Sequence, residues 1–334
     1  MPSSSLQDAF QDAAPASPRP VVAEIVRSGF VEGHHYGSVV ALAADGSVDW
    51  AIGEVHAPVL PRSSNKPLQA LAMVENGLDL PPEQLELACA SHSGEAMHVE
   101  QVIAMLRAVG LDEDALQTPP DWPLDDEARN DTIASGGGKA PVLMNCSGKH
   151  AAMLATCVVN GWDTATYLDP AHPLQVAIVE TLARATGVPV EFVAVDGCGA
   201  PLLSTSLVGL ARAFAGLATS ADGPAARVAS AIRRHPEMVS GSRRDEARLH
   251  RAVPRLIGKA GAESVYAVAL PDGRAWALKT DDGAARVRPV LMTAALRRSG
   301  VLAEPGVDAE AVEALGRHEL LGGGRVVGEI RAIF

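Results

Sequence analysis

Apolar residues near both ends of the chain alternate with polar ones or run continuously over short stretches, as they do in β-strands. The predicted strands are residues 21–28, 36–43, 48–53, 192–195, 263–270, 275–279 and 326–333. The turn sequences Ala-Asp-Gly-Ser at 44–47 and Pro-Asp-Gly at 271–273 each join two of these strands as a hairpin. These hairpins predict an antiparallel sheet built from both ends of the chain.

Between the strands, apolar positions recur with helical spacing. The predicted helices are residues 64–76, 83–90, 96–108, 149–159, 172–186, 203–216, 222–234, 244–253, 285–298 and 307–316. Residues 118–140 are rich in proline and glycine and are predicted to be a loop-rich crossing over the surface. The pattern indicates an α+β fold, a mainly antiparallel sheet covered by helices with a helical subregion. Residues 1–20 are predicted to be a disordered lead-in and residues 21–334 a single domain.

The net charge and the apolar stretches of the chain indicate which kinds of binding partner are unfavourable. The chain has 334 residues and a formal net charge of −12, which disfavours nucleic acid or an anionic membrane as its main partner. Its apolar stretches are too short for a signal peptide or a membrane span. The four cysteines are too widely spaced for a disulfide framework, so we expect a reduced, cytoplasmic setting.

Ser63 and Lys66 form a Ser-x-x-Lys pattern at the predicted start of the first helix. Residues three apart share a helix face, so the Lys66 amine can reach the Ser63 hydroxyl, whereas Ser64 points elsewhere. Pro67 is compatible only with the first helical turn, which places Ser63 near the positive end of the helix dipole. Such a pair can act as nucleophile and base if the pKa of the lysine falls. A capping serine beside a solvated lysine gives the same pattern.

Four further segments rich in glycine and reactive side chains lie at predicted strand–helix boundaries. They are Cys-Ala-Ser-His-Ser-Gly-Glu at 89–95, Asn-Cys-Ser-Gly-Lys-His-Ala-Ala-Met-Leu at 145–154, Asp-Gly-Cys-Gly-Ala-Pro at 196–201 and Gly-Lys-Ala-Gly-Ala-Glu at 258–263. Together with Arg-Ser-Ser-Asn-Lys-Pro at 62–67, and in this order, they closely resemble the L-asparaginase II family, the rhizobial-type asparaginases. The resemblance is less distinct towards the C-terminus.

The resemblance implies a serine β-lactamase/glutaminase-like fold, a homodimer and hydrolysis of L-asparagine. It gives a catalytic role to Ser91, the first serine of the Ser-His-Ser run. It also implies a zinc ion held beside the active site by Cys146, Lys149 and Cys198. Because a lysine ligand must lose its proton, we expect weak, pH-sensitive binding. Such a zinc would tune the substrate pocket rather than act as the Lewis acid.

Lys259, placed just before a predicted strand, resembles the lysine of the Lys-Thr-Gly element in β-lactamase-like enzymes, although Ala follows it here. Its charge would lower the pKa of Lys66. An amino-acid substrate needs an anion for its ammonium group and a cation for its carboxylate. We expect Asp196 to bind the ammonium, and Arg62 or His150 to bind the carboxylate.

The residues by themselves leave other interpretations open. His92 or His98 could be the base in a Ser-His arrangement, and Ser91 could be a helix cap. Cys146 and Cys198 could be inert buried thiols. The protein could be a β-lactamase-like esterase or peptidase acting on another acyl group, or a non-catalytic homologue that binds an amino acid or zinc. The sequence as a whole predicts a serine–lysine L-asparaginase.

Overall fold

The structure, a computed structural model, describes residues 19–334, so nearly all of the predicted N-terminal lead-in lies outside the described residues. Its centre is an eight-stranded antiparallel sheet in the order β6-β7-β8-β2-β1-β10-β9, with β3 paired to β2. The strands of this sheet are β1 (Val21–Arg27), β2 (Phe30–Leu42), β3 (Val48–Ile52), β6 (Ile257–Gly261), β7 (Val265–Ala269), β8 (Ala275–Thr280), β9 (His318–Gly322) and β10 (Arg325–Ala332). A separate two-stranded ladder joins β4 (Val193–Val195) to β5 (Pro201–Leu203).

Both predicted hairpins are confirmed. The turn between β2 and β3 closes where the Ala43 N–H donates to the Ser47 carbonyl, and the turn between β7 and β8 closes where Leu270 donates to Arg274. β2 also pairs with β8, with Val39 opposite Leu278. The two ends of the chain therefore form one sheet, and the predicted α+β architecture is confirmed.

Helices cover both faces of this sheet. They are α1 (Lys66–Glu75), α2 (Pro82–Ala88), α3 (Ala96–Ala108), α4 (Asp126–Ala134), α5 (Ser147–Asn160), α6 (Pro173–Thr186), α7 (Leu207–Thr219), α8 (Gly223–Arg234), α9 (Pro236–Val239), α10 (Asp245–Ala252), α11 (Arg288–Arg298) and α12 (Ala309–Leu315). Short 3-10 helices are η2 (Arg62–Asn65), η3 (Glu113–Ala115), η4 (Pro141–Leu143), η5 (Ala285–Val287) and η6 (Val301–Ala303).

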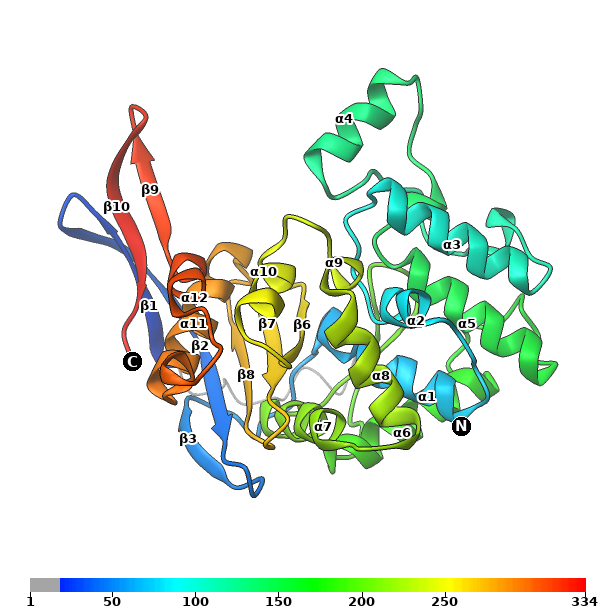
Figure 1. Cartoon of the computed structure of the whole chain (residues 1–334), viewed down its shortest axis with the longest axis horizontal. Coiled ribbons are helices and arrows are strands. Elements are labelled where there is room, and N and C mark those ends of the chain that lie inside the picture. Colours follow the sequence, from blue (N-terminus) through cyan, green and yellow to red (C-terminus); the bar gives the residue numbers. More distant parts are fainter. Residues whose placement is uncertain (1–18) are drawn as a thin grey trace, which may run out of the picture.

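Alternate residues of the central strands enter two different cores, as a period of two requires. On β2, Val40 and Leu42 pack with helices α1, α2, α5, α6, α7 and α8, whereas Val39 and Ala41 pack with α10, α11 and α12. Figure 1 shows α1, α2, α3 and α5 gathered beyond the β6 edge of the sheet, with α4 projecting above α3, whereas α7 lies against β7 and β8. The predicted catalytic segments lie where this helical part meets β6.

The structure also corrects some sequence-based boundaries. Residues 118–140, predicted as loop-rich, also contain a helix that was not predicted, α4, whose N-terminus is capped by the Asp125 side chain. Lys259 was expected just before a strand, but it lies inside β6. Strands β5 and β9 were not predicted. In the part of the chain that the structure describes, none of the helices is long and apolar enough to cross a membrane.

Candidate active site

Ser63 lies in η2, the short 3-10 helix that leads directly into α1. Arg62 begins it with φ of +51°, an uncommon conformation for a side chain-bearing residue. Ser63 is half-buried, and its hydroxyl has no hydrogen-bond partner among residues 19–334. Ser64 is fully buried, and its hydroxyl donates to the Pro61 carbonyl over 2.6 Å. The two neighbouring serines therefore differ: the Ser64 hydroxyl is bonded, whereas that of Ser63 has no partner among residues 19–334.

Lys66, the first residue of α1, points into the interior and is 1% exposed. Its nitrogen donates to the Ala90 carbonyl, to Ser91 Oγ at 3.0 Å and to Cys146 Sγ at 3.1 Å. An ammonium group has three hydrogens, so these acceptors account for all of them. The structure thus joins Lys66 to Ser91 and Cys146, two other predicted site residues.

Ser91 is carried by the segment after α2, and three contacts fix that segment. The Ser91 N–H donates to the Val239 carbonyl, and the His92 N–H donates to the Asn145 carbonyl. Gly94 has φ of +77°, and a Cβ there would lie 2.8 Å from Pro123, so only glycine fits. Ser91 itself is 9% exposed and therefore less accessible than Ser63.

His92 and His98 stack with ring centroids 5.3 Å apart. His92 Nδ1 accepts from the Gly94 N–H, which leaves Nε2 to donate to Ser147 Oγ at 2.8 Å. Burial, with smaller contributions from His98 and Lys66, holds the pKa of His92 well below its usual value. His98 Nε2 donates to the Glu237 carbonyl. Both rings thus form structural contacts, and within residues 19–334 neither ring forms a hydrogen bond with Ser63 or Ser91.

Lys259 is fully buried in β6 and forms an ion pair that the sequence did not predict. Its nitrogen donates to Glu246 Oε1 at 2.6 Å and to the Ala260 carbonyl at 2.7 Å. Burial, and to a smaller extent the charge of Lys66, lowers the pKa of Lys259 to about 8, although Glu246 opposes the shift. Lys259 and Lys66 therefore lie near enough for their charges to interact, as predicted.

β6 also contacts the start of η2 directly. A Cβ built on Gly261 would lie 2.6 Å from the Pro61 carbonyl oxygen and 3.2 Å from the Ser63 nitrogen. No side chain fits between these two backbones. Gly261 therefore allows the strand that carries Lys259 to lie against the residue predicted as nucleophile.

Cys146, Lys149 and Cys198 converge at the start of α5 and in the segment after β4. Lys149 Nζ lies 3.3 Å from Cys198 Sγ, and the two thiols share a hydrogen bond. That hydrogen bond, followed by the charge of Lys149, lowers the pKa of Cys198 against the effect of burial. Burial alone would lower the pKa of Lys149. The nearby sulfur atoms and Asp196 have the larger combined effect, so the pKa of Lys149 is raised above its usual value.

These side chains fit the donor set expected for zinc, two sulfur atoms and one amine. In residues 19–334 no group of three or more His, Cys, Asp or Glu side chains is placed to hold a metal ion. Lys149 would therefore have to be the third ligand, and its proton would have to leave first. The arrangement agrees with a weak, pH-sensitive site.

The predicted substrate-binding residues fall into two places. Arg62 Nε donates to Asp196 Oδ1 at 2.9 Å, and its Nη1 lies 3.5 Å from Glu263 Oε1. Arg62 also lines a cavity of about 400 Å³ together with Glu263 and the β4–β5 ladder. His150 is fully buried, and its Nδ1 is 2.8 Å from the Tyr167 hydroxyl. His150 thus lies beside Tyr167 and near Cys198, whereas Arg62 pairs with Asp196.

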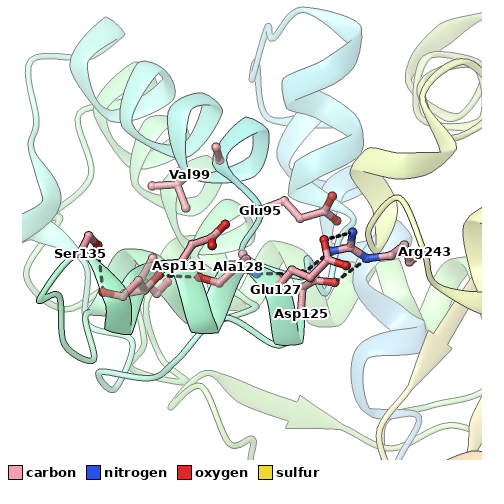
Figure 2. A pocket seen from close by; sticks show the side chains of 12 residues that line it. Glu95, Val99, Asp125, Glu127, Ala128, Asp131, Ser135 and Arg243 are labelled. Atoms are coloured by element: carbon pink, nitrogen blue, oxygen red, sulfur yellow. Dashed lines mark hydrogen bonds and ion pairs between the residues drawn. The ribbon is translucent and has the colours of Figure 1, made fainter.

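A second cavity, of about 620 Å³, lies between α3 and α4 (Figure 2). Glu95, Asp125, Glu127 and Asp131 point towards it, and Arg243 reaches in from the segment before α10 to pair with Asp125 and Glu127. Glu95 is already engaged by the Ser242 hydroxyl at 2.7 Å. These contacts tie α4 to the segment that carries Ser91, and the predicted catalytic residues do not line this cavity.

Comparison with protein-family models shows the family to which this chain belongs. A model described as L-asparaginase II matches residues 23–332. The chain belongs to the L-asparaginase II family. The match confirms the resemblance seen in the sequence and extends it through the C-terminal region, where the motifs were less distinct. Membership of the L-asparaginase II family supports a hydrolase with a small-molecule substrate. A comparison with curated protein sequences found no match.

Among solved structures, the chain is similar to a β-lactamase from Mycobacterium bovis, with 16% identity and a TM-score of 0.46 over 84% of this chain and 96% of that one. It is also similar to Mglu in its glutamate form, with 14% identity and a TM-score of 0.40 over 84% of this chain and 59% of that one. A third is EstCE1, a hydrolase with promiscuous acyltransferase activity, with 12% identity and a TM-score of 0.39 over 73% of this chain and 88% of that one.

Sequence reasoning missed Glu246 and Glu263. Glu246 lies 13 positions before its partner Lys259 and belongs to another element, so spacing could not connect them. Its placement on the buried face of a short, charged helix was the available signal, since a buried carboxylate needs a partner. Glu263 follows the Lys-Ala-Gly segment. The sequence could not show that Gly261 lies against η2, and this contact is what brings Glu263 near Arg62.

Proposed function

We propose that this chain hydrolyses L-asparagine to L-aspartate and ammonia through an acyl-enzyme on Ser63. The observation that carries the proposal is the position of the buried Lys66 nitrogen. It lies 3.0 Å from Ser91 Oγ and belongs to the first helical turn after Ser63. The proposed base and proton relay are therefore in contact, and the proposed nucleophile lies three residues before the base. Membership of the L-asparaginase II family gives the class of reaction.

Ser63 is the better nucleophile of the three serines near Lys66. Its hydroxyl is half-exposed and without a hydrogen-bond partner in the described chain, so a substrate can approach it. Ser64 uses its hydroxyl to bind the Pro61 carbonyl. Ser91 is nearly buried and already bonded to Lys66, which suits a residue that passes protons.

Lys66 serves as the base in its neutral form. A neutral amine has two hydrogens and one lone pair, so it can keep two of its three contacts and accept the Ser63 proton. Lys66 is 1% exposed, and the charge of Lys259 acts on it from β6. Ser63 lies three residues before Lys66, in the 3-10 helix that leads into α1, and the Lys66 nitrogen is bonded to Ala90, Ser91 and Cys146.

The reaction then has two halves. Ser63 Oγ attacks the side-chain amide carbon of asparagine, and the backbone N–H groups at the start of η2 stabilise the oxyanion. The C–N bond breaks, and the proton held by Lys66 passes through Ser91 to the departing ammonia. A water molecule then attacks the β-aspartyl ester while Lys66 takes its proton. Aspartate leaves as Ser63 regains its hydrogen.

Arg62 and Asp196 would bind the zwitterionic end of the substrate. Their ion pair of 2.9 Å already presents one cation and one anion side by side, the complement of an amino acid's carboxylate and ammonium. We assign the carboxylate to Arg62 rather than to His150, because His150 is fully buried. Asp196 takes the ammonium.

Zinc is part of the proposal as a modulator. Cys146, Cys198 and a neutral Lys149 would hold the ion. When bound, it would supply positive charge beside the substrate pocket. Lys66 contacts Cys146 at 3.1 Å, so the same sulfur atom connects the proposed metal site to the proposed base.

Ammonia release from L-asparagine and L-glutamine tests the proposal. We expect turnover of asparagine, and its loss by about 100-fold or more in Ser63→Ala and Lys66→Ala. Ser64→Ala is the matched control and should largely keep activity. Full activity of Ser63→Ala would refute the mechanism. Cleavage of nitrocefin or p-nitrophenyl esters, without action on either amide, would indicate a β-lactamase-like acyl hydrolase. Thermal stabilisation by asparagine without ammonia release would indicate a binding protein.

A further inference from the structure

Glu246 is a fully buried carboxylate that the proposed reaction does not yet use. It lies in the first turn of α10, and its side chain is 0% exposed, as is that of Lys259. Oε1 accepts from Lys259 Nζ at 2.6 Å and from the Ala260 N–H at 2.8 Å. One oxygen therefore binds both the side chain and the backbone of β6, next to the glycine that contacts η2.

Several charged or titratable groups face this ion pair from the elements around it. Arg244 precedes α10, and its Nη2 lies 3.6 Å from Glu246 Oε2. Lys66 from α1 and His250 from α10 are close enough to Lys259 for their charges to interact. The remaining groups are Cys89 of α2, Arg288 of α11 and Tyr266 of β7.

We propose that Glu246 is a positioning residue of this site, whose carboxylate keeps the Lys259 ammonium charged and holds β6 against the start of η2. This inference rests on the proposed function, because it assigns Glu246 a part in that reaction. Glu246 does not touch the reacting atoms. It acts through Lys259 and through the Ala260 N–H.

The physical reason is the cost of burying a lysine. An isolated ammonium group in the interior loses its proton readily, because burial disfavours its charged form. Lys66 opposes the charge of Lys259 as well. Among the groups that act on Lys259, Glu246 is the one that favours its charge, and it lies at hydrogen-bond distance. Removing the carboxylate should therefore lower the pKa of Lys259, so that Lys259 loses its proton at a lower pH than in the intact pair.

The sign of the effect on activity follows. The proposed mechanism uses the positive charge of Lys259 close to Lys66 and Ser63. Activity should therefore fall as the pH rises through the pKa of Lys259, which is about 8 in the intact pair. In Glu246→Gln this alkaline limb of kcat/KM should move to lower pH by about one to three units.

A lysine NMR titration tests the inference without relying on turnover. The chain has only five lysines, Lys66, Lys139, Lys149, Lys259 and Lys279. Labelled with carbon-13 at Cε, each gives a resonance that reports its own protonation. The Lys259 resonance is assigned by its loss in Lys259→Arg. We expect its titration in Glu246→Gln to move to lower pH, with the alkaline limb of kcat/KM moving in step.

Asp245→Asn is the matched control. Asp245 is the adjacent carboxylate on α10, and it binds Arg288 at 2.8 Å instead of Lys259. Its replacement should leave the Lys259 titration and the pH profile unchanged. If Glu246→Gln does not fold, as judged by its circular dichroism, Glu246→Asp is used. That variant keeps the negative charge but holds it farther from Lys259, because the aspartate side chain is shorter. We therefore expect a smaller shift of the Lys259 titration in the same direction.

Each outcome decides one of the two proposals. An unshifted Lys259 titration in a folded Glu246 variant overturns the inference. A shifted titration with an unchanged pH profile also overturns it, because Glu246 would then be purely structural. If the wild-type protein releases no ammonia from asparagine, the proposed function fails instead. The titration then still shows whether Glu246 controls the charge of Lys259.

Discussion

At the scale of single residues, two buried lysines in this site form hydrogen bonds with hydroxyl and sulfur atoms. Lys66 contacts Ser91 and Cys146, and Lys149 contacts Cys198. Each lysine needs a hydrogen-bond acceptor because an unpaired buried ammonium group is costly. The same contacts join the proposed base to Ser91 and join Lys149 to Cys198, so the stability of the site and its proposed chemistry depend on the same atoms.

Zinc binding is predicted at this scale. Wild-type protein dialysed to equilibrium against a buffer that contains zinc should hold about one ion per chain more than the buffer alone accounts for, because two thiolates and an amine converge there. Cys198→Ser should lose most of that zinc, since a hydroxyl is a poor ligand for it. Elemental analysis by mass spectrometry measures the content. Cys157→Ser, which changes a buried thiol further along α5, is the control. Equal zinc in all three proteins would contradict the assignment.

The sequence was informative about individual site residues where a motif named them. Ser63, Lys66 and Ser91 were predicted from one pattern and a family resemblance, and the structure brings Lys66 and Ser91 together. It also places Cys146 and Cys198 in contact. Spacing could not show that Lys66 would point at Ser91 rather than at Ser63, because the direction of a long side chain depends on its tertiary neighbours.

At the scale of elements, the site depends on β6 lying directly against η2. Gly261 makes this possible, since its absent side chain leaves room for the Pro61 carbonyl. The sequence indicated strands near this point but missed β6 itself, which is short, contains two glycines and carries a lysine. These residues are poor strand formers, and pairing with β7 outweighs their local preference.

Gly261→Ala should therefore damage the site more than the fold. The added methyl group would lie 2.6 Å from the Pro61 oxygen, so β6 and η2 must move apart. We expect a loss of stability of about 1–3 kcal/mol, as for other overpacked positions, and a larger relative fall in kcat. Thermal melts and steady-state ammonia release measure the two effects. Gly216→Ala, in α7 with open space around it, is the control; it should keep kcat and be more stable than wild type by up to about 1 kcal/mol, because alanine favours a helix interior.

At the scale of the whole molecule, one sheet supports two cores. Val40 and Leu42 of β2 face one, and Val39 and Ala41 face the other. The hairpin turns and apolar periods predicted most of this architecture. They could not show that β2 pairs with β8, because that contact joins segments far apart in the sequence. The homodimer and the single domain stay predictions.

Unfolding should be one cooperative transition, because neither core can lose the shared sheet and persist. Trp50 and Trp276 report on the core beneath α11, and Trp162 packs against the other core. Urea unfolding followed by tryptophan fluorescence and by circular dichroism should give coincident midpoints. Two separated transitions would show that the helical part and the sheet are independent units.

Trapping the acyl-enzyme tests the central claim most directly. The protein is mixed with L-asparagine, quenched in acid within its first turnovers, digested and analysed by mass spectrometry. The account predicts one β-aspartyl group on Ser63, present in wild type and Ser64→Ala and absent in Ser63→Ala. A β-aspartyl group on Ser91, or continued turnover by Ser63→Ala, would contradict it.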